Sequence, residues 1–207
     1  MPVLTKERII TLMNEKAIKD RLIVTPLFDP DELIDPVSID VRLGNEFIIM
    51  KKESFPALDI MKKKELSPGL ERYQESVRLN FHEEFVLHPN QLIIGSTLEY
   101  VCLPPGLMCY VVGKSTWGRM GLIIATATKV DPGFKGCITL EMINQGEVPV
   151  ILYPGIPIAQ LVFHETIGEA KYEGGYNCAT GPQFPDFSKN IEAWKYWFPK
   201  DKQNLPK

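Results

Sequence analysis

The chain has 207 residues, of which 44% are apolar and 24% are charged, and its formal net charge at pH 7 is −3. This composition is typical of a globular protein long enough to bury a core in one domain, and we expect neither a membrane span nor a membrane partner. Because the chain lacks an overall positive charge, we expect no nucleic-acid partner, and any phosphate that it binds must meet a local group of cations.

The N-terminal segment, the cysteines and the histidines indicate the location of the protein and whether it binds a metal ion. Residues 1–8 lack the charged and then apolar order of an export signal, so we expect a cytoplasmic protein. The cysteines show no C-x-x-C spacing and are expected to be reduced. The histidines form no H-x-x-H or H-x-E pair, which argues against a zinc ion bound by the protein.

The first predicted element is a short amphipathic helix from Thr5, a candidate N-cap, to about Lys19, with Ile9 and Met13 on its apolar side. After Pro26 the pattern changes to many short β-type runs broken by Pro, Gly and Asn. This pattern predicts a mainly β fold, either a sandwich or a barrel. The expected strands cover residues 38–43, 46–50, 77–81, 85–87, 91–94, 107–112, 121–126, 137–143, 148–152 and 158–163.

Two segments fall outside this strand pattern. Residues 51–73 are rich in charge, and we interpret them as a solvated loop. From Gly168 onward the strand spacing is lost, and an aromatic stripe predicts a short helix over residues 188–198. We therefore expect a β domain over residues 1–167 and a C-terminal extension over residues 168–207.

The most informative strand covers residues 137–143, because it carries the carboxylate of Glu141 inside an apolar run. Strand alternation places Thr139 and Glu141 on one face, with Leu140 and Met142 on the other. An ionised carboxylate is costly to bury without a partner. Glu141 is therefore either paired structurally or kept for chemistry, and we favour chemistry.

A polar loop and a turn precede this strand. The loop reads Gly-Lys-Ser-Thr-x-x-Arg over residues 113–119, a size that suits a phosphate group, and Asp-Pro-Gly follows at residues 131–133. Each feature also has a purely structural interpretation. Ser115 could be a turn residue, Lys114 and Arg119 could be solvated cations, and Asp-Pro-Gly forms a β-turn for local reasons alone.

Taken together, these motifs resemble a known family. Residues 113–122 resemble the Gly-Arg-Ser-Ser-x-x-Arg-x-Gly-Leu signature of the dCTP deaminase family, within the dUTPase-like superfamily. Residues 38–44, 130–141 and 154–161 resemble three further motifs of that family, in the same order. One block alone would be weak evidence, whereas four in order, over roughly residues 4–172, are strong.

The resemblance implies a distorted jelly roll of the dUTPase-like type that assembles as a homotrimer, with active sites where subunits meet. The implied reaction is hydrolytic removal of the 4-amino group of dCTP, which gives dUTP and ammonia without zinc. A second hydrolysis to dUMP and pyrophosphate follows in the bifunctional members. The implied ligand is thus a small nucleotide, dCTP or dUTP, bound together with Mg²⁺.

The chemistry of the residues agrees with that reaction. Attack of water on C4 of cytosine needs a base for the water and an acid for N3 and the departing amine, and one carboxylate that accepts and returns a proton serves both steps. Glu141 is our candidate for that carboxylate. Ser115 and the backbone near Ala127 would hold the water and the tetrahedral centre.

The resemblance also implies which residues bind the substrate. The triphosphate, with Mg²⁺ bridging its oxygens, would meet the cations, hydroxyls and amides of the polar loop. The implied binding residues are Lys114, Ser115, Thr116 and Arg119 for the phosphates, Asp131 for the deoxyribose 3′-hydroxyl or a water beside it, Ala127 and the backbone of Thr139 and Leu140 around the base, and Gln160, Lys171 and Tyr172 closing on the phosphates.

The chain departs from the family pattern in four places. Lys114 replaces the usual Arg, which keeps the charge and loses a planar two-pronged grip on phosphate. Thr116 replaces a second Ser. Thr128 stands where deaminase-only members commonly have His and bifunctional members have Gly. A β-branched residue restricts the backbone, so this loop should be stiffer than in the bifunctional members. After Tyr172 the tail is longer than the family pattern, and the Gln that usually follows has no clear counterpart.

Two other functions stay open at this stage. A dUTPase would hydrolyse the bond between the α- and β-phosphates and would use Asp131 to orient water. Glu141 argues against it, because a plain dUTPase has no need of a carboxylate in that strand. Lys114, Thr128 and the altered tail leave room for a catalytically silent trimer that senses nucleotides or binds a partner protein.

Overall fold

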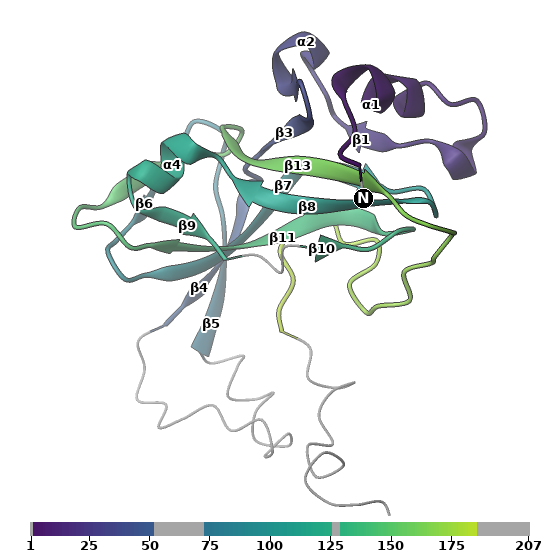
Figure 1. Ribbon diagram of the computed structural model, residues 1–207. Coiled ribbons are helices and arrows are strands. Elements are labelled where there is room, and N and C mark those ends of the chain that lie inside the picture. Colours follow the sequence, from purple (N-terminus) through teal and green to yellow (C-terminus); the bar gives the residue numbers. More distant parts are fainter. Residues whose placement is uncertain (1, 52–72, 126–128, 186–207) are drawn as a thin grey trace, which may run out of the picture. The chain divides into compact units, whose positions relative to one another are not determined.

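A computed structural model of the chain describes residues 2–51, 73–125 and 129–185 (Figure 1). Of the described residues, 2–49 and 76–183 belong to one compact unit. The domain division expected at residues 167 and 168 stays a prediction. The helix expected over residues 188–198 lies outside the described residues.

The described chain is mainly β, as its sequence predicts. Its helices are α1 (Lys6–Met13), the 3₁₀ helix η1 (Ile18–Asp20), α2 (Pro30–Leu33) and α4 (Ser115–Arg119). Its strands are β1 (Ile23–Thr25), β2 (Ile34–Asp35), β3 (Ser38–Arg42), β4 (Glu46–Met50), β5 (Gln74–Arg78), β6 (Phe85–Leu87), β7 (Leu92–Cys102), β8 (Leu107–Gly113), β9 (Leu122–Ile124), β10 (Lys129–Val130), β11 (Lys135–Asn144), β12 (Val150–Leu152) and β13 (Pro157–Glu165).

The helices of the described chain are short. The predicted N-terminal helix ends earlier than expected, at Met13, and Ile9 is its buried residue. Thr5 stands at the N-cap as predicted, although its side chain makes no capping hydrogen bond. None of the described helices has the length and apolar character needed to cross a bilayer. The expected cytoplasmic location stays a prediction.

Two sheets make up most of the fold. One has the order β5-β4-β7-β11-β9, with β1 added to β7, and the other has the order β10-β8-β13-β3-β2. A separate antiparallel pair joins β6 and β12. The longest pairs, β7 with β11 and β8 with β13, are antiparallel, and in the view of Figure 1 the ribbons of β8 and β13 lie above that of β11.

The core lies between the facing sides of these sheets. One sheet contributes Leu140 and Met142, and the other contributes Ile39, Leu161 and Phe163, all of them fully buried. Burying such a side chain contributes about 1.5–3 kcal/mol relative to leaving it exposed. The alternate residues of the same strands face outward, which is where polar side chains can be displayed.

Strand β7 is longer than its sequence pattern predicts. The expected strand ended at Ile94 because Gly95, Ser96 and Thr97 are typical of a loop, yet β7 continues to Cys102. A bulge lies in this unpredicted half. Between the pairs Cys137–Tyr100 and Thr139–Ser96, three residues of β7 lie opposite one residue of β11.

The bulge holds buried polar groups that satisfy one another. Thr97 Oγ1 accepts a hydrogen bond from the backbone N–H of Ile138 at 2.9 Å and donates one to the carbonyl of Glu99 at 2.8 Å. The Glu99 carboxylate is fully buried and pairs with Arg42, whose Nε lies 2.7 Å from Glu99 Oε1. Burial raises the pKa of Glu99, and the hydrogen bonds from Arg42 oppose that rise.

Candidate active site

Strand β11 displays Glu141 as its sequence predicts. Leu140 and Met142 are fully buried, while Thr139 and Glu141 are half-buried on the opposite face. The alternation therefore sets the Glu141 side chain at the edge of the protein interior. A carboxylate there is partly shielded from water and still reachable by a ligand.

The turn before β11 brings a second carboxylate nearby. The backbone N–H of Phe134 donates to the carbonyl of Asp131 at 3.2 Å, which closes the expected Asp-Pro-Gly turn. Gly133 has φ +76°, and a Cβ atom there would lie 3.2 Å from the backbone nitrogen of Tyr172. A larger residue at this position would be strained and would collide with the C-terminal segment.

The C-terminal segment docks along the first half of β11, mainly through backbone atoms. The N–H of Cys178 donates to the carbonyl of Lys135 at 2.6 Å, and the N–H of Cys137 donates to the carbonyl of Ala179 at 2.7 Å. Gly136 makes this approach possible, because a Cβ atom there would lie 3.0 Å from the Ala179 nitrogen.

The end of this segment is held by a side chain. The backbone N–H of Gln183 donates to Thr139 Oγ1 at 3.2 Å, which brings Gln183 beside the outward face of β11. Gly181 is buried, and a Cβ atom there would lie 2.7 Å from Glu46 Oε2. Residues 177–183 are therefore fixed at both ends against the sheet.

A cavity of about 240 Å³ lies between β11, the turn and the docked segment. It unites four predicted site residues: Asp131, Thr139, Glu141 and Tyr172. It is also lined by residues that sequence reasoning did not assign to the site: Lys129, Val130, Phe134, Cys137, Ile138, Tyr176, Ala179 and Gln183.

The titratable groups of the cavity have distinct environments. Asp131 Oδ1 lies 2.5 Å from Lys129 Nζ, so that carboxylate is matched with a cation. Burial raises the pKa of the Cys137 thiol to about 11, so this thiol is neutral at pH 7 and is a poor nucleophile. Glu141 is the half-buried carboxylate of this cavity, and it lies on the face of β11 opposite the core, where a ligand can reach it.

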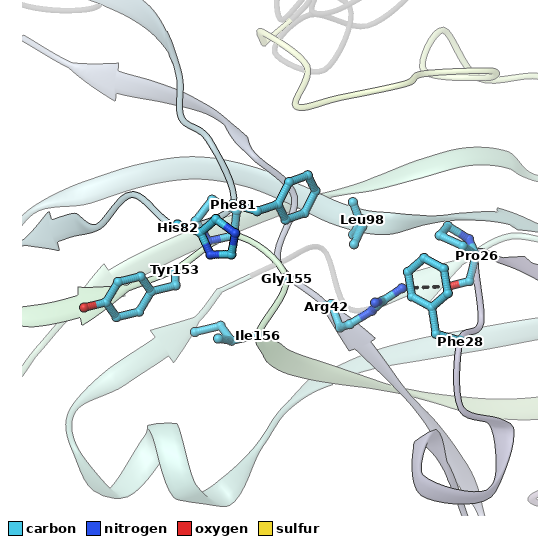
Figure 2. Close-up of a pocket in the computed structure, with 10 residues that line it drawn as sticks. Pro26, Phe28, Arg42, Phe81, His82, Leu98, Tyr153, Gly155 and Ile156 are labelled. Atoms are coloured by element: carbon cyan, nitrogen blue, oxygen red, sulfur yellow. Dashed lines mark hydrogen bonds between the residues drawn. The ribbon is translucent and has the colours of Figure 1, made fainter.

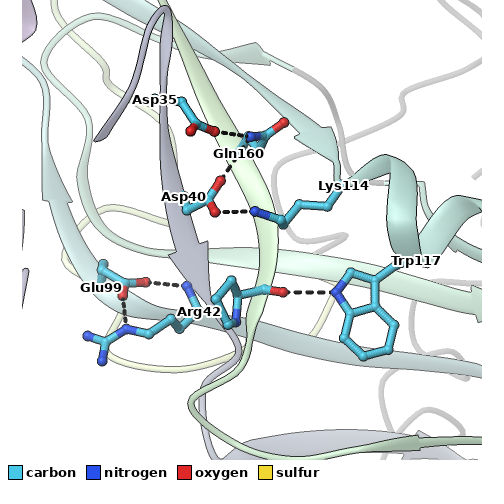
Figure 3. Close-up of polar contacts among 8 residues, drawn as sticks. Asp35, Asp40, Arg42, Glu99, Lys114, Trp117 and Gln160 are labelled. Atoms are coloured by element: carbon cyan, nitrogen blue, oxygen red, sulfur yellow. Dashed lines mark hydrogen bonds and ion pairs between the residues drawn. The ribbon is translucent and has the colours of Figure 1, made fainter. Parts of the chain in front are cut away.

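Other predicted residues lie on the second sheet. Lys114, which follows β8, forms an ion pair with Asp40 of β3, and Asp40 also accepts a hydrogen bond from Gln160 of β13 at 2.9 Å (Figure 3). Gln160 donates a further bond to Asp35 of β2 at 2.8 Å. The structure thus brings Lys114 and Gln160 together with two carboxylates that sequence reasoning did not single out.

The predicted phosphate loop opens α4 and is exposed to solvent. Ser115, Thr116 and Arg119 are exposed, whereas Trp117 donates from Nε1 to the carbonyl of Pro157 at 2.8 Å and holds the helix against β13. Within the described chain, these loop residues are not among those that line the Glu141 cavity. Within one chain, the cationic loop therefore lies outside the cavity that holds Glu141, the candidate acid and base.

The remaining predicted residues have less to show. The Leu140 side chain is fully buried on the core face, so only its backbone can meet a ligand. Lys171 is exposed beside Tyr172, whose ring packs edge-on against Phe134 with centroids 5.5 Å apart. Ala127 lies outside the described residues, as does Thr128.

A larger hollow, of about 670 Å³, lies elsewhere on the same unit (Figure 2). Its walls are mainly apolar and aromatic, and its one arginine, Arg42, is already engaged. Arg42 pairs with Glu99, donates from Nη2 to the Pro26 carbonyl at 2.8 Å and lies 4.7 Å from the centre of the Phe28 ring. Among the described residues this hollow is lined by His82 and by no carboxylate, so the smaller cavity, which holds Glu141, is the better candidate for acid and base chemistry that uses a carboxylate.

Comparison with known proteins shows the family of this chain. Residues 3–166 match the model of a family described as dCTP deaminase-like. The chain belongs to the dCTP deaminase-like family. A protein of Halorubrum lacusprofundi named dCTP deaminase is 38% identical to this family member over 184 residues, which cover 83% of this chain and 89% of that protein.

Relatives in this family carry two kinds of name. A protein of Methanobrevibacter smithii named dCTP deaminase, dUMP-forming, is 37% identical over 173 residues, which cover 81% of this chain and 87% of that protein. The crystal structure of 2′-deoxycytidine 5′-triphosphate deaminase from Agrobacterium tumefaciens matches with a TM-score of 0.57 at 22% identity, covering 78% of this chain and 47% of that chain. This last likeness shows a shared fold.

Replacing Thr139 with Val tests how the Glu141 cavity of this family member keeps its C-terminal wall. Valine has the shape of threonine and lacks the oxygen that accepts from the Gln183 N–H, a loss of about 1 kcal/mol. We expect hydrogen exchange at the Gln183 amide to become about fivefold faster, measured by NMR. Thr116→Val, on exposed α4, is the control that should change nothing. Equal exchange rates in the two variants would contradict this docking.

Proposed function

We propose that the protein catalyses the hydrolytic deamination of dCTP to dUTP and ammonia. The observation that carries the proposal is Glu141, a half-buried carboxylate in a cavity that also holds Asp131, Thr139 and Tyr172. The names of the relatives support the choice of substrate, because they belong to dCTP deaminases of both kinds.

In the proposed reaction, C4 of the cytosine ring faces Glu141. The carboxylate takes a proton from water as the water oxygen bonds to C4, and it passes that proton to N3 to give a tetrahedral intermediate. The carboxylate then takes the proton of the new C4 hydroxyl and gives it to N4, and the C4–N4 bond breaks as the C4 carbonyl forms and ammonia leaves. One dCTP and one water thus give one dUTP and one ammonia, and Glu141 returns to its starting state without a zinc ion.

The triphosphate is proposed to bind the loop that opens α4. Lys114 and Arg119 supply charge, and Ser115 and Thr116 supply hydroxyl groups for charge-assisted hydrogen bonds. Because these residues lie outside the Glu141 cavity of the same chain, we place them at the cavity of a neighbouring copy. A homotrimer with closed symmetry would build three such shared sites.

Mg²⁺ is proposed to arrive bound to the triphosphate, where it would neutralise phosphate charge. The nearby carboxylates are already matched with cations, Asp131 with Lys129 and Asp40 with Lys114. Within the described chain, no three acidic, histidine or cysteine side chains gather as a metal site. The phosphate oxygens are then the hard donors that suit this ion.

A second step, hydrolysis of dUTP to dUMP and pyrophosphate, is the alternative that one observation favours. Asp131 lines the same cavity as Glu141, so its carboxylate could orient water toward the α-phosphorus. A protein that is only a dUTPase would catalyse this hydrolysis and would make no use of Glu141. A silent nucleotide-sensing trimer would bind dCTP and release nothing.

Incubation with dCTP and Mg²⁺ tests the reaction directly. We expect ammonia in equal amount to the dCTP consumed, measured by an enzyme-coupled assay, with the nucleotide products resolved by chromatography. Accumulating dUTP indicates deamination alone, and dUMP with pyrophosphate indicates both steps. Binding of dCTP without ammonia release would reject the deaminase and leave the sensor.

Glu141→Gln tests the role of the carboxylate. Glutamine keeps the size of the side chain and cannot accept and return the proton, so ammonia release should fall at least about a hundredfold. The dissociation constant for dCTP, measured by calorimetry, should stay within about twofold. Glu147→Gln changes an exposed glutamate and is the matched control. Ammonia release that survives in Glu141→Gln would assign the proton transfer to another group.

Mixed oligomers test whether the site is shared. Glu141→Gln and Arg119→Ala chains should each be inactive alone. When they are unfolded and refolded together, random mixing in a shared-site oligomer should restore about one quarter of the wild-type rate of ammonia release. The same two proteins refolded separately and then combined serve as the control. No gain on joint refolding would mean that each site belongs to one chain.

A further inference from the structure

A row of four polar side chains crosses the five-stranded sheet from β2 to the end of β8 (Figure 3). Asp35 ends β2, Asp40 lies on β3, Gln160 lies on β13, and Lys114 directly follows β8. Asp40 and Gln160 are directly opposite each other in the antiparallel pair of β3 and β13. The row is therefore fixed by the order and register of the strands.

Both N–H groups of the Gln160 amide are engaged within this row. Its Nε2 lies 2.8 Å from Asp35 Oδ2 and 2.9 Å from Asp40 Oδ1, and a primary amide has two such donors. The opposite orientation of the amide would place its carbonyl oxygen against two carboxylates, so the hydrogen-bond pattern determines which way Gln160 points. The side chain of Gln160 has no further N–H to offer a phosphate.

Asp40 also forms an ion pair with Lys114, and this pair has little access to water. Asp40 Oδ2 faces Lys114 Nζ, and the two side chains are 9% and 24% exposed. A carboxylate at that depth is stable when a cation and hydrogen bonds match it. The Lys114 ammonium has three N–H donors and gives one to Asp40, which leaves donors for an anion at the loop.

We infer that Gln160 and Asp40 are positioning residues, which hold the Lys114 ammonium in place for the phosphates of the nucleotide. Gln160 acts through Asp40 and makes no phosphate contact itself. This inference rests on the proposed triphosphate site at α4. It follows from the contacts because a lysine stem is flexible, and fixing its ammonium before binding removes an entropy cost from the binding step.

The identity of residue 114 fits this arrangement. An arginine would present a planar fork whose two arms can both bind one carboxylate, so the pairing face of the fork would be turned toward Asp40. Lysine is a compact charge that can bridge Asp40 and a phosphate at once. Lysine at position 114 is therefore compatible with both contacts.

A double-mutant cycle tests the inference by calorimetry with two probes, dCTP with Mg²⁺ and inorganic tripolyphosphate. We expect Lys114→Met and Gln160→Met each to weaken both ligands by about tenfold or more. The double variant should bind within about twofold of Lys114→Met alone, because Gln160 acts only through Lys114. Gln145→Met, at an exposed glutamine, should bind like the wild type.

Additive losses would overturn the inference, because a double variant weakened by the product of the two single effects means that Gln160 touches phosphate itself. An unchanged affinity in Gln160→Met would overturn it as well. Thermal unfolding checks that each variant is folded. If Gln160→Met is unfolded, Gln160→Asn keeps the amide, shortens its reach and carries the same expectations.

The deaminase proposal and the positioning role can fail separately. Coupled losses with tripolyphosphate, together with no ammonia release from dCTP, would keep the positioning role and reject the deaminase. Ammonia release together with additive losses would keep the deaminase and reject the positioning role.

Discussion

The buried ion pair of Glu99 and Arg42 is the interaction on which the arrangement of both sheets depends. Glu99 can lie in the interior only because Arg42, from the other sheet, matches its charge and two of its acceptor sites. That match fixes the bulge of β7, where Thr97 satisfies the Ile138 N–H. Beyond the bulge, Glu141 of β11 pairs with Ile94 of β7. A shift of this pairing by one residue would move the side chains of β11 to the opposite face, so the register decides that Glu141 faces the cavity.

The structure divides the expected chemistry between its two sheets. The six-stranded sheet carries Glu141 in a cavity with a paired aspartate and a neutral thiol, which suits proton transfer to a heterocyclic ring. The five-stranded sheet carries Lys114 on a polar row, which suits an anion. A nucleotide triphosphate has both a ring and an anion, so joining the two sheets across a subunit boundary would match both halves of one ligand.

Local patterns in the sequence were enough to predict part of this site. Alternation alone placed Glu141 opposite Leu140, and Asp-Pro-Gly carries its own turn. The second half of β7 could not be predicted, because Gly95 to Thr97 are typical of a loop. The contact that accompanies this half of the strand is the buried pair of Glu99 with Arg42, which is distant in sequence. The contact of Gln183 with Thr139 and the two carboxylates around Gln160 likewise depend on long-range packing, which no local pattern records.

The docking of residues 177–183 on β11 has a consequence for the history of the chain. Most of that contact uses main-chain atoms, which every residue type except proline provides in full. Substitutions at the tail positions that make only main-chain contacts can therefore accumulate while the cavity keeps its wall. The positions least free to change are the glycines at the contact, Gly136 on the strand and Gly181 in the tail, where a side chain would meet the opposite partner. Divergence in the tail sequence is thus compatible with an unchanged architecture.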